Sequence, residues 1–415
     1  MSRLFKFLNN CKVHHLEKCF LDKYPILSNY NFIFNNIIRL RRFYLSSKNN
    51  LQIDNTPFRN YNYKQIYKKN NENTIGYVRV PVGIAGPLTI NNYKCFAPIA
   101  TTEGALIGSI NRGCKIINES GKNITTMVIN KGITRSPIIQ FNKIDEIPYF
   151  LDWIDNNKNK LKVVFNETSS IAQFKDLTPI IAGNRVHLRI QCSSGDAMGM
   201  NIISKGTDRI LQYITQYFNI KIVSISGNTC TDKKSSSMNW VNGRSNTINV
   251  ETFLEKKIIK SRLNIDYHDL IKLNIDKNLV GSALAGTIGG NNAHVSNIIS
   301  GLFISTGQDP AQIGTSSFAL TQYEDYDDKY MRVFLTMPSL EIGTIGGGTD
   351  LNDQTAYLKL LGINKKDNET NPGYNTKKLC EIIGGFVIAG EISLMASLAY
   401  GNLVSSHMNL NRRNK

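Results

Sequence analysis

Residues 186–207 read VHLRIQCSSGDAMGMNIISKGT. The first seven residues alternate apolar and polar side chains, as in a half-buried strand, and a helical pattern runs from about residue 200 to 218. Between them, glycines let the backbone approach a ligand, and the free N–H groups of a helix start can hold a pyrophosphate. The chain has neither GxGxxG nor a P-loop, and such a turn is more often only a turn. The stretch predicts strand, turn and helix, and leaves nucleotide binding as one of two interpretations.

The neighbouring segments extend this unit into a small α+β insert. Short apolar runs occur at 137–141 and 162–165, a helical pattern covers about 145–155, and KIVSIS at 221–226 has the pattern of a strand. The rest of the body is richer in small residues at helical spacing. Its expected elements are a helix over about 104–117, a closely packed, charge-poor helix over 278–306, a strand at 330–337, a Gly-rich loop at 343–348 and helices near 351–361 and 376–402.

The composition is that of a folded protein of ordinary polarity, without a zinc motif or a membrane span. With 415 residues, 41% of them hydrophobic and 20% charged, the chain is long enough for two or three packed domains. The formal charge of +17 favours anionic ligands or a merely solvated basic surface. Seven scattered cysteines without a CxxC pair argue against zinc or a redox dithiol, and favour a reducing compartment. Apolar runs are interrupted by charge, Asn or Gly, so we expect no membrane span.

The first fifty residues are more basic than the remainder. They hold nine Lys or Arg against Glu17 and Asp22, and they end near RRFYLSS, as in a mitochondrial presequence. Transit peptides are usually poor in acids, so an Asn-rich disordered arm on a cytosolic protein is the alternative. Residues 51–73 form a polar connecting segment.

Four residues suggest chemistry, although each has an ordinary structural explanation. Lys233 lies in the loop SGNTCTDKK, where a lysine can stabilise an oxyanion, but taken alone the loop is more often a solvated surface loop. Asp309 follows a glycine and is explained equally by capping. His407 can protonate a leaving group, and Glu103 precedes a predicted helix. Only their combination can decide between these interpretations.

Ten strings occur in an order and spacing that match one family. They are ENTIGYVRVPVGIAGPL, TTEG, NRGC, SGDAMGMNIISKGT, SGNTCTDKK, NKNLVGSALAGTIGGNNAHVSN, GQDPAQ, MPSLEIGTIGGGT, AGEISLMASLA and SHM. Together they resemble 3-hydroxy-3-methylglutaryl-coenzyme A (HMG-CoA) reductase of the eukaryotic class, from about Phe58 to Arg412. The resemblance implies reduction of HMG-CoA to mevalonate and coenzyme A by two hydride transfers from NADPH, within isoprenoid and sterol biosynthesis.

The resemblance also implies roles for individual residues. Glu103, Lys233, Asp309 and His407 match the catalytic positions: a proton donor, the oxyanion-binding lysine, its partner, and the acid for the departing thiolate. The segment that would bind the dinucleotide comprises Asp196, Met198, Gly199, Met200 and Asn201. Substrate contacts fall on Arg135, Ser226, Lys234, Lys277 and Asn297 for the acyl part, and on Ser109, Asn111, Arg112 and Lys115 for coenzyme A. No metal is implied.

The fold implied is α+β, with a large, mostly helical substrate-binding domain and an inserted ferredoxin-like dinucleotide-binding domain. The expected boundaries are 1–50 targeting or disordered, 51–73 connecting, 74–136 and 236–407 large domain, 137–225 small domain, 226–235 lysine loop and 408–415 tail. A homodimer or tetramer with shared active sites is expected. Animal relatives carry an arginine near the cofactor's 2′-phosphate, where this chain reads Ser169–Ile171. NADPH and NADH therefore both stay open, with Lys175 and Arg412 as substitutes for that arginine.

Three other classes of protein are alternatives to a reductase. A basic RNA-binding or scaffold protein would need an aromatic-basic motif, which the sequence lacks, so no nucleic-acid partner is expected. A catalytically dead relative is disfavoured by the intact set of four residues. An enzyme that uses Lys233 for Schiff-base chemistry is the third alternative.

Overall fold

The computed structural model describes residues 30–49, 51–67, 69–364 and 371–400, which divide into two compact units, Met1–Pro81 and Val82–Lys415. In the first unit, α3 (Tyr30–Asn49) precedes a loop with one 3-10 turn, η1 (Tyr63–Gln65). The guanidinium of Arg42 donates to Thr56 Oγ1 (2.6 Å) and Ile75 O (3.1 Å), and lies 4.2 Å from the ring centre of Phe58. Residues 30–49 are thus helical, although the sequence reading placed them in a targeting or disordered segment.

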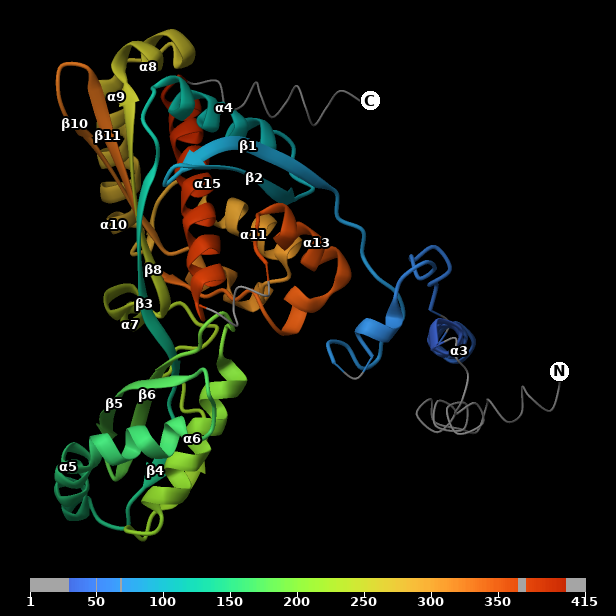
Figure 1. The fold of residues 1–415 in the computed structure, drawn as a ribbon, viewed down its shortest axis with the longest axis vertical. Helices are drawn as coiled ribbons and strands as arrows, with labels where there is room; N and C mark the ends of the chain where they lie inside the picture. The colour runs from blue at the N-terminus through green and yellow to red at the C-terminus, as the bar shows by residue number, and fades with distance from the viewer. Residues whose placement is uncertain (1–29, 50, 68, 365–370, 401–415) are drawn as a thin grey trace. The chain divides into compact units, whose positions relative to one another are not determined.

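The small domain of the second unit is an antiparallel sheet covered by two helices (Figure 1). Its strand order is β7-β4-β6-β5, and β4, β5, β6 and β7 alternate with the helices as β-α-β-β-α-β, the ferredoxin-like arrangement. The expected ferredoxin-like fold is therefore confirmed. The elements are β4 (Ile138–Gln140), α5 (Ile147–Asn166), β5 (Gln173–Ala182), β6 (Arg185–Ser193), α6 (Met200–Ile214) and β7 (Lys221–Ser224).

Two details of the small domain differ from the sequence reading. The apolar run at 162–165 is the last part of α5, where Val164 and Phe165 face the domain core. A short apolar run does not distinguish a strand from a buried helical turn, and the core contact decided this one. Strand β5 was not anticipated, because QFKDLTPIIA lacks a clean alternation.

The large domain is built from a second sheet, a hairpin and helices. Its sheet has the order β3-β8-β11-β10-β9, with β9 paired to β10 in parallel and all other pairs antiparallel. The strands are β1 (Val82–Ile90), β2 (Tyr93–Ala100), β3 (Thr125–Arg135), β8 (Ser245–Glu255), β9 (Gly290–Asn291), β10 (Ala319–Asp325) and β11 (Tyr330–Leu340). The helices are α4 (Leu106–Glu119), α7 (Ser237–Asn242), α8 (Lys256–Leu263), α9 (Tyr267–Leu273), α10 (Ser282–Leu284), α11 (Val295–Thr306), α12 (Ile313–Ser316), α13 (Asn352–Leu360) and α15 (Tyr374–Ala399), with short turns η4 (Pro310–Gln312) and η5 (Gly347–Asp350). A further short turn, η2 (Ile144–Glu146), precedes α5 in the small domain.

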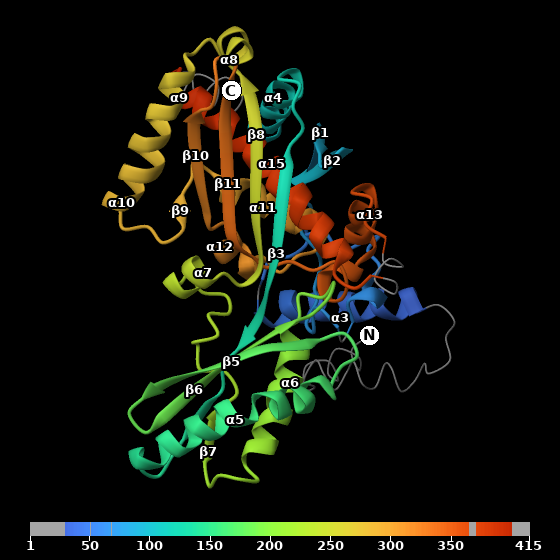
Figure 2. The ribbon, with the colours of Figure 1, turned by 60° about the vertical axis from the view of Figure 1, so that its left-hand side comes forward.

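Strand β3 belongs to both sheets (Figure 2). Its first residues pair with β8, and Ile133 to Arg135 pair with β6. At the change of partner, Gly132 has φ +87°, and a Cβ there would lie 2.6 Å from the carbonyl oxygen of Cys192. Only glycine fits this position without strain. The continuous strand carries Arg135 from the large sheet to the small one.

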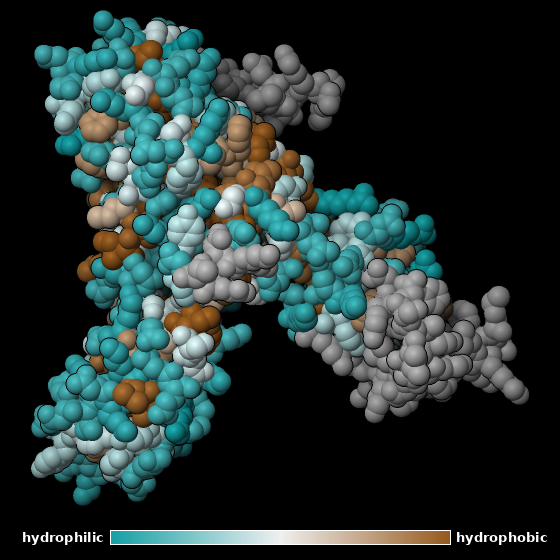
Figure 3. All heavy atoms as spheres, in the orientation of Figure 1, coloured by the Kyte–Doolittle hydropathy of each residue, from teal (hydrophilic) through white to brown (hydrophobic). Residues whose placement is uncertain are grey.

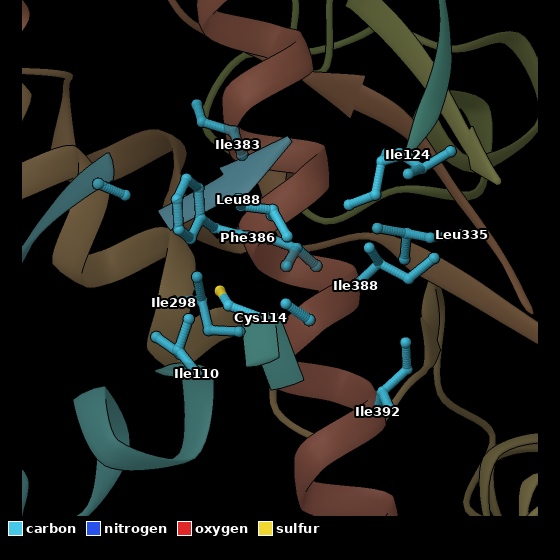
Figure 4. Packing of buried hydrophobic residues seen from close by; sticks show 14 of the residues in the cluster. Leu88, Ile110, Cys114, Ile124, Ile298, Leu335, Ile383, Phe386, Ile388 and Ile392 are labelled. Atoms are coloured by element: carbon cyan, nitrogen blue, oxygen red, sulfur yellow. The ribbon is translucent and has the colours of Figure 1, made fainter. Parts of the chain in front are cut away.

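Helix α15 is the core of the large domain. Every residue from Leu379 to Ser393 is buried, and the helix packs against α4, α11 and β8. Figure 4 shows Phe386 of α15 beside Leu88, on the side of Ile298, and Ile388 of the same helix beside Leu335. A helix that is apolar on all sides must be surrounded, by protein or by lipid. Of the described helices, α15 alone has the length and hydropathy to span a membrane, and 78% of its apolar window is buried inside the protein.

The helix expected over 278–306 is wrong in extent and in packing. A π-helix, η3 (Asn274–Gly281), is followed by the single turn of α10. The end of α10 and the loop after it, residues 283–288, are exposed, and α11 begins at Val295. Leu284 is 85% exposed. Figure 3 shows hydrophobic side chains gathered beside α10, and a second group over the β1–β2 hairpin. Small, apolar residues thus lie on the surface of the single chain here, and not in its core.

Candidate active site

The lysine loop, residues 226–235, follows β7 and has an unusual backbone. Asn228, Thr231 and Lys233 all have φ near +60°, a left-handed conformation that costs energy for residues other than glycine. Hydrogen bonds hold the loop in place: Thr134 Oγ1 donates to Cys230 O (2.6 Å), and Thr231 Oγ1 donates to Asn239 Oδ1. Such a conformation persists only where the surroundings fix it, as they do here.

Lys233 and Asp309 form an ion pair. The Nζ of Lys233 lies 2.8 Å from Asp309 Oδ2, and the lysine side chain is 45% exposed. The hydrogen bond to Asp309 is the largest cause that raises the pKa of Lys233, and the charges of Asp309, Asp232 and Glu341 add to it. The other oxygen of Asp309 caps η4 by accepting from Ala311 N (3.0 Å). Capping and ion pairing, weighed as alternatives, therefore both occur.

Glu103 and Asn297 form a second pair. Glu103 is exposed and lies three residues before α4, and its Oε1 accepts a hydrogen bond from Asn297 Nδ2 (3.3 Å). Its own N–H donates to Thr101 Oγ1 (3.0 Å), which fixes the backbone at this point. Asn297 lies in the first turn of α11.

The two pairs lie at opposite ends of α11. Asn297 and Thr306 are nine residues apart in this helix, which corresponds to about 14 Å at 1.5 Å per residue. Asp309 lies three residues beyond the end of the helix. One chain thus holds Glu103 and Asn297 at one end of α11 and Lys233 and Asp309 at the other.

The remaining residues of the predicted acyl site have individual partners. Lys277 lies in the π-helix η3, a form of helix that is frequent at functional sites, and donates to Asn278 Oδ1 (3.1 Å). Arg135 Nε donates to Ser204 Oγ (3.0 Å), and Lys234 Nζ donates to Asp232 O (3.2 Å). Ser226 Oγ lies 3.7 Å from Cys230 Sγ.

Four residues of α4 form the predicted coenzyme A segment. Asn111 Oδ1 accepts from Gly86 N (2.7 Å), Ser109 Oγ lies 3.0 Å from Ser393 Oγ, and Lys115 lies 3.8 Å from Glu119. Arg112 donates to Ser393 Oγ (2.9 Å) and Ser393 O (2.8 Å) of α15, and burial lowers the pKa of its guanidinium.

Arg112 also lines a small cavity. The cavity measures about 280 Å³, and its lining residues are Arg112, Arg262, Leu263, Asn264, Ala396, Ser397 and Tyr400. Arg262 makes a two-pronged contact with Glu119, at 2.6 and 3.0 Å. The cavity therefore has a guanidinium on two sides, which suits a phosphate.

The residues of the predicted dinucleotide segment differ in exposure, from the buried Asp196 to the exposed Asn201. Asp196 is fully buried, and its Oδ1 accepts from Thr376 N (2.7 Å) at the start of α15. Its side chain therefore joins two segments of the chain and does not face open space. Gly199 has φ +99° and precedes α6, while Asn201 is exposed. Met200 Sδ lies 3.1 Å from the guanidinium of Arg244.

A larger cavity adjoins the start of this segment. It measures about 720 Å³ and is lined by residues of both sheets and of the α15 start, including Asn130, Ser170, Lys175, Gly195, Gly373 and Lys377. None of its lining residues is acidic. Burial and the nearby charge of Lys131 lower the pKa of Lys175. Lys175 Nζ donates to the backbone oxygen of Asn130, and in the described part of the chain neither Lys175 nor Lys377 has a carboxylate within ion-pair distance. The charges of both lysines are therefore not neutralised by an acidic partner.

Two of the predicted residues are not described by the structure, and no metal site is found among those that are. His407 and Arg412 lie outside the described residues. Within the described ranges, no three His, Cys, Asp or Glu side chains are grouped so that they could hold a metal ion. The cysteines described there, Cys95, Cys114, Cys192, Cys230 and Cys380, are all buried and free.

The sequence reading missed the buried charges behind the lysine loop. Arg244 and Glu341 are both fully buried and bonded to each other, and Arg244 also contacts Asp232, which receives a hydrogen bond from Gln312 as well. A lone arginine in NGRS carries no local signal of such a role. The one sequence feature that could have pointed to this cluster is that Asp232 directly precedes Lys233.

Known proteins resemble this chain in sequence. A family profile described as hydroxymethylglutaryl-coenzyme A reductase matches residues 37–412. The 3-hydroxy-3-methylglutaryl-coenzyme A reductase 1 proteins of Hevea brasiliensis and Arabidopsis thaliana are each 43% identical over 381 residues, which is 91% of this chain. The chain spans 66% and 64% of the length of these two relatives, respectively.

Solved structures agree on the fold. A 3-hydroxy-3-methylglutaryl-coenzyme A reductase of Streptococcus pneumoniae superimposes with a TM-score of 0.64 at 15% identity, over 94% of this chain and 98% of the other. A class II reductase of that organism, solved with NADPH in open conformations, gives 0.62 at 16% identity, over 79% and 78%. The match to the family profile includes the lysine loop, α11 and both sheets, so the chain belongs to the hydroxymethylglutaryl-coenzyme A reductase family.

Proposed function

We propose that the chain reduces HMG-CoA to mevalonate and coenzyme A with two hydrides from NADPH, in the mevalonate pathway of isoprenoid and sterol biosynthesis. The observation that carries the proposal is the Lys233–Asp309 ion pair on a strained, fixed loop of a family member. Attack of hydride on a thioester puts negative charge on oxygen, and a positioned ammonium group stabilises that charge. Asp309 keeps Lys233 protonated, so the same pair disfavours Schiff-base chemistry, which needs a neutral amine.

Two proton donors, the carboxyl group of Glu103 and the imidazole of His407, complete the proposed chemistry. Glu103, held by Asn297, supplies a proton when the aldehyde is reduced. His407 is proposed to protonate the departing thiolate. The cationic side chains Arg135, Lys234 and Lys277 neutralise the free carboxylate of the acyl group.

Coenzyme A is proposed to bind along α4. Its phosphates need cationic partners, and the 280 Å³ cavity between Arg112 and Arg262 offers two guanidinium groups. Ser109, Asn111 and Lys115 lie on the same helix and extend the polar surface. Arg262 is an addition to the contacts expected from sequence.

The cofactor is proposed to be NADPH in preference to NADH. When bound, the cofactor supplies the hydride, and the residues present fit its anionic groups. The guanidinium of Arg244 contacts both Met200 and Asp232, the residue before Lys233. The Met200 end of the dinucleotide segment is therefore the end that lies nearer Lys233. The cavity with Lys175 and Lys377 adjoins the other end, at Gly195, where the adenosine phosphate would lie. The two lysines take the place of the arginine expected at Ser169–Ile171.

The active enzyme is proposed to be a homodimer or a tetramer with shared sites. Glu103 and Lys233 lie at opposite ends of α11, too far apart to act on one carbon in a single chain. A second copy would supply Lys233 and Asp309 to the Glu103 of the first. The exposed apolar side chains of Leu284 and Ile288 support a surface that is covered in the assembly.

Mitochondrial import is a separate proposal. It is supported by the excess of basic residues in 1–50, with a cytosolic protein as the alternative. Imaging of residues 1–50 fused to a reporter tests it, and a diffuse cytosolic signal would reject it.

The main experiment follows oxidation of NADPH and of NADH by the purified full chain with HMG-CoA. Turnover with release of one coenzyme A per two cofactor molecules is expected, and a folded oligomer without turnover with either cofactor would refute the proposal. Glu103→Gln should leave a folded oligomer with a kcat lower by about a hundredfold or more. Glu146→Gln, at a partly exposed site in η2, is the matched control.

Cofactor preference is tested by Lys175→Ala combined with Lys377→Ala. Loss of two phosphate contacts should lower kcat/KM for NADPH by roughly tenfold to a hundredfold and leave NADH unaffected. Calorimetric binding of 2′-phosphorylated ADP and of ADP measures the same preference without turnover. Lys158→Ala, which removes an exposed lysine of α5, is the control. Equal losses for both cofactors would refute the assignment of this cavity to the 2′-phosphate.

A further inference from the structure

A fully buried guanidinium lies behind the lysine loop. Arg244 donates from Nη1 to Glu341 Oε2 and from Nε to Thr134 Oγ1 (2.8 Å), and its Nη2 lies 3.2 Å from Asp232 Oδ1. The side chains of Arg244 and Glu341 have no exposed surface. Buried charges persist only when they are paired in good geometry, so the position of Arg244 is closely fixed. The planar fork of arginine can reach several acceptors at once, which a lysine cannot do.

Asp232, the residue before Lys233, is held from two sides. Besides Arg244, Gln312 Nε2 donates to Asp232 Oδ1 at 2.8 Å. Gln312 is three residues from Asp309, in the 3-10 turn η4 that Asp309 caps. Two adjacent loop residues thus contact two residues of one turn, Asp232 with Gln312 and Lys233 with Asp309. Displacement of Asp232 would therefore displace Lys233 from its partner.

Arg244 also touches the segments proposed for substrate and cofactor. Thr134, which accepts from Arg244 Nε, donates to Cys230 O in the lysine loop and precedes Arg135. Met200, at the start of α6, lies 3.1 Å from Arg244 Nη2. A single side chain is therefore in contact with the lysine loop, strand β3 and the dinucleotide segment.

We propose that Arg244 is a positioning residue of the active site. Clamped by Glu341, it fixes Asp232 so that the ammonium of Lys233 stays on Asp309, and it aligns this loop with Met200 and Arg135. The inference rests on the proposed reductase function for its kinetic consequences. Its geometric content, the dependence of Lys233 on Arg244 and Asp232, is independent of the substrate.

The charged groups around Lys233 also influence its pKa. The anionic neighbours are Asp309, Asp232 and Glu341, and the cations nearby are Arg244 and Lys234. Asp232 both anchors the loop and adds a negative charge next to Lys233. Its neutralisation should therefore loosen the loop and make Lys233 easier to deprotonate.

The experiment compares Arg244→Lys and Asp232→Asn with Arg332→Lys. Arg332 also bridges two carboxylates, Glu251 and Glu324, but on an exposed face of the large sheet, so it controls for loss of a bridging guanidinium. Competitive acetylation with mass spectrometry gives the pKa of Lys233 in each protein, with Lys234 in the same peptide as reference. Steady-state kinetics give kcat and KM.

Arg244→Lys should lower kcat by roughly tenfold to a hundredfold, with KM for HMG-CoA within about twofold, because positioning is lost and binding groups remain. Asp232→Asn should lower kcat similarly and lower the pKa of Lys233 relative to that of Lys234, because a negative charge next to Lys233 is lost. Arg332→Lys should change neither. If Arg244→Lys fails to fold, Asp232→Asn decides, since Asp232 is partly exposed.

Folded, oligomeric Asp232→Asn and Arg244→Lys with wild-type kcat and an unchanged pKa of Lys233 would overturn the proposal. A wild-type chain without any turnover would instead refute the reductase function. In that case the acetylation measurement still decides whether Lys233 depends on Asp232.

Discussion

Gly113, in the NRGC string, provides a test of how α4 is held against the core helix. A Cβ built on Gly113 would lie 1.8 Å from the carbonyl oxygen of Ala389 in α15, and 2.5 Å from its carbonyl carbon. Real Cβ atoms essentially never approach closer than 3.0 Å, so the helices would have to separate by more than 1 Å. The obstructing atoms belong to a helix backbone and cannot rotate away. Gly113→Ala therefore overpacks a rigid contact.

The expected loss of stability follows from two opposing terms. Overpacking of a core contact costs about 1–3 kcal/mol, occasionally more, and a rigid backbone neighbour places this case at the upper end. Replacement of a helical glycine by alanine returns about 1 kcal/mol of helix propensity. A net loss of about 2 kcal/mol is expected. At about 2.1 cal/mol/K of unfolding entropy per residue, this lowers the Tm of a 415-residue chain by roughly 2–3 °C.

Gly108 supplies the matched control in the same helix. A Cβ on Gly108 meets nothing within 4 Å, and the residue is exposed, so Gly108→Ala should keep or raise the Tm. Differential scanning calorimetry of both variants at equal protein concentration measures the contrast. A Gly113→Ala variant that melts at or above the wild type, with Gly108→Ala behaving as expected, would refute the close-approach argument. Separation of the helices should also break the contact of Arg112 with Ser393 and raise the KM for HMG-CoA.

Other predictions concern the assembly, one helix cap and the ion pair. Leu284→Asp places a charge on an 85% exposed apolar surface, so sedimentation should show smaller oligomers and a loss of activity at low concentration; an unchanged oligomer would reject this interface. Ser236→Ala removes the cap that accepts from Met238 N (3.1 Å) and should destabilise the protein by about 1 kcal/mol, whereas Ser236→Asp should not. The pKa of Lys233 is raised in the folded state, so its stabilising contribution is present below the ordinary lysine pKa of about 10.4 and disappears at higher pH. The Tm difference between wild type and Asp309→Asn should therefore be small, equivalent to at most about 1 kcal/mol for this exposed pair. It should disappear as the pH rises through the raised pKa of Lys233, and a difference that persists once Lys233 is neutral would contradict the ion pair as its source.

The local elements could be predicted from the sequence where the pattern and the contacts agree. The alternation in VHLRIQC lies within β6, and the glycine turn after it leads into α6 at Met200. The predicted helix near 104–117 corresponds to α4, and Glu103 precedes it. These features depend on residue spacing and on backbone freedom, which are written in the sequence itself.

The sequence misjudged segments whose environment lies far away in the chain. The charge-poor stretch 278–306 has the composition of a buried helix, but only α11 is buried, and residues 283–288 are exposed. The same composition suits the core of one chain and the interface between two. Asp196 is a predicted cofactor contact, and the structure adds that its buried carboxylate accepts a hydrogen bond from Thr376 N at the start of α15, 180 residues further along.

What the sequence by itself determined was the family and the α+β class, together with the candidates for the reactive groups, because ordered motifs and residue types are properties of the chain alone. The tertiary structure decided which groups meet. It joined Lys233 to Asp309 and Glu103 to Asn297, and it placed the pairs at opposite ends of α11. It also placed Arg244 behind the lysine loop, in contact with residues up to 110 positions away in the chain. Such contacts depend on the packing of β3, β8 and α15 into one body, and the spacing of residues along the chain carries no record of that packing.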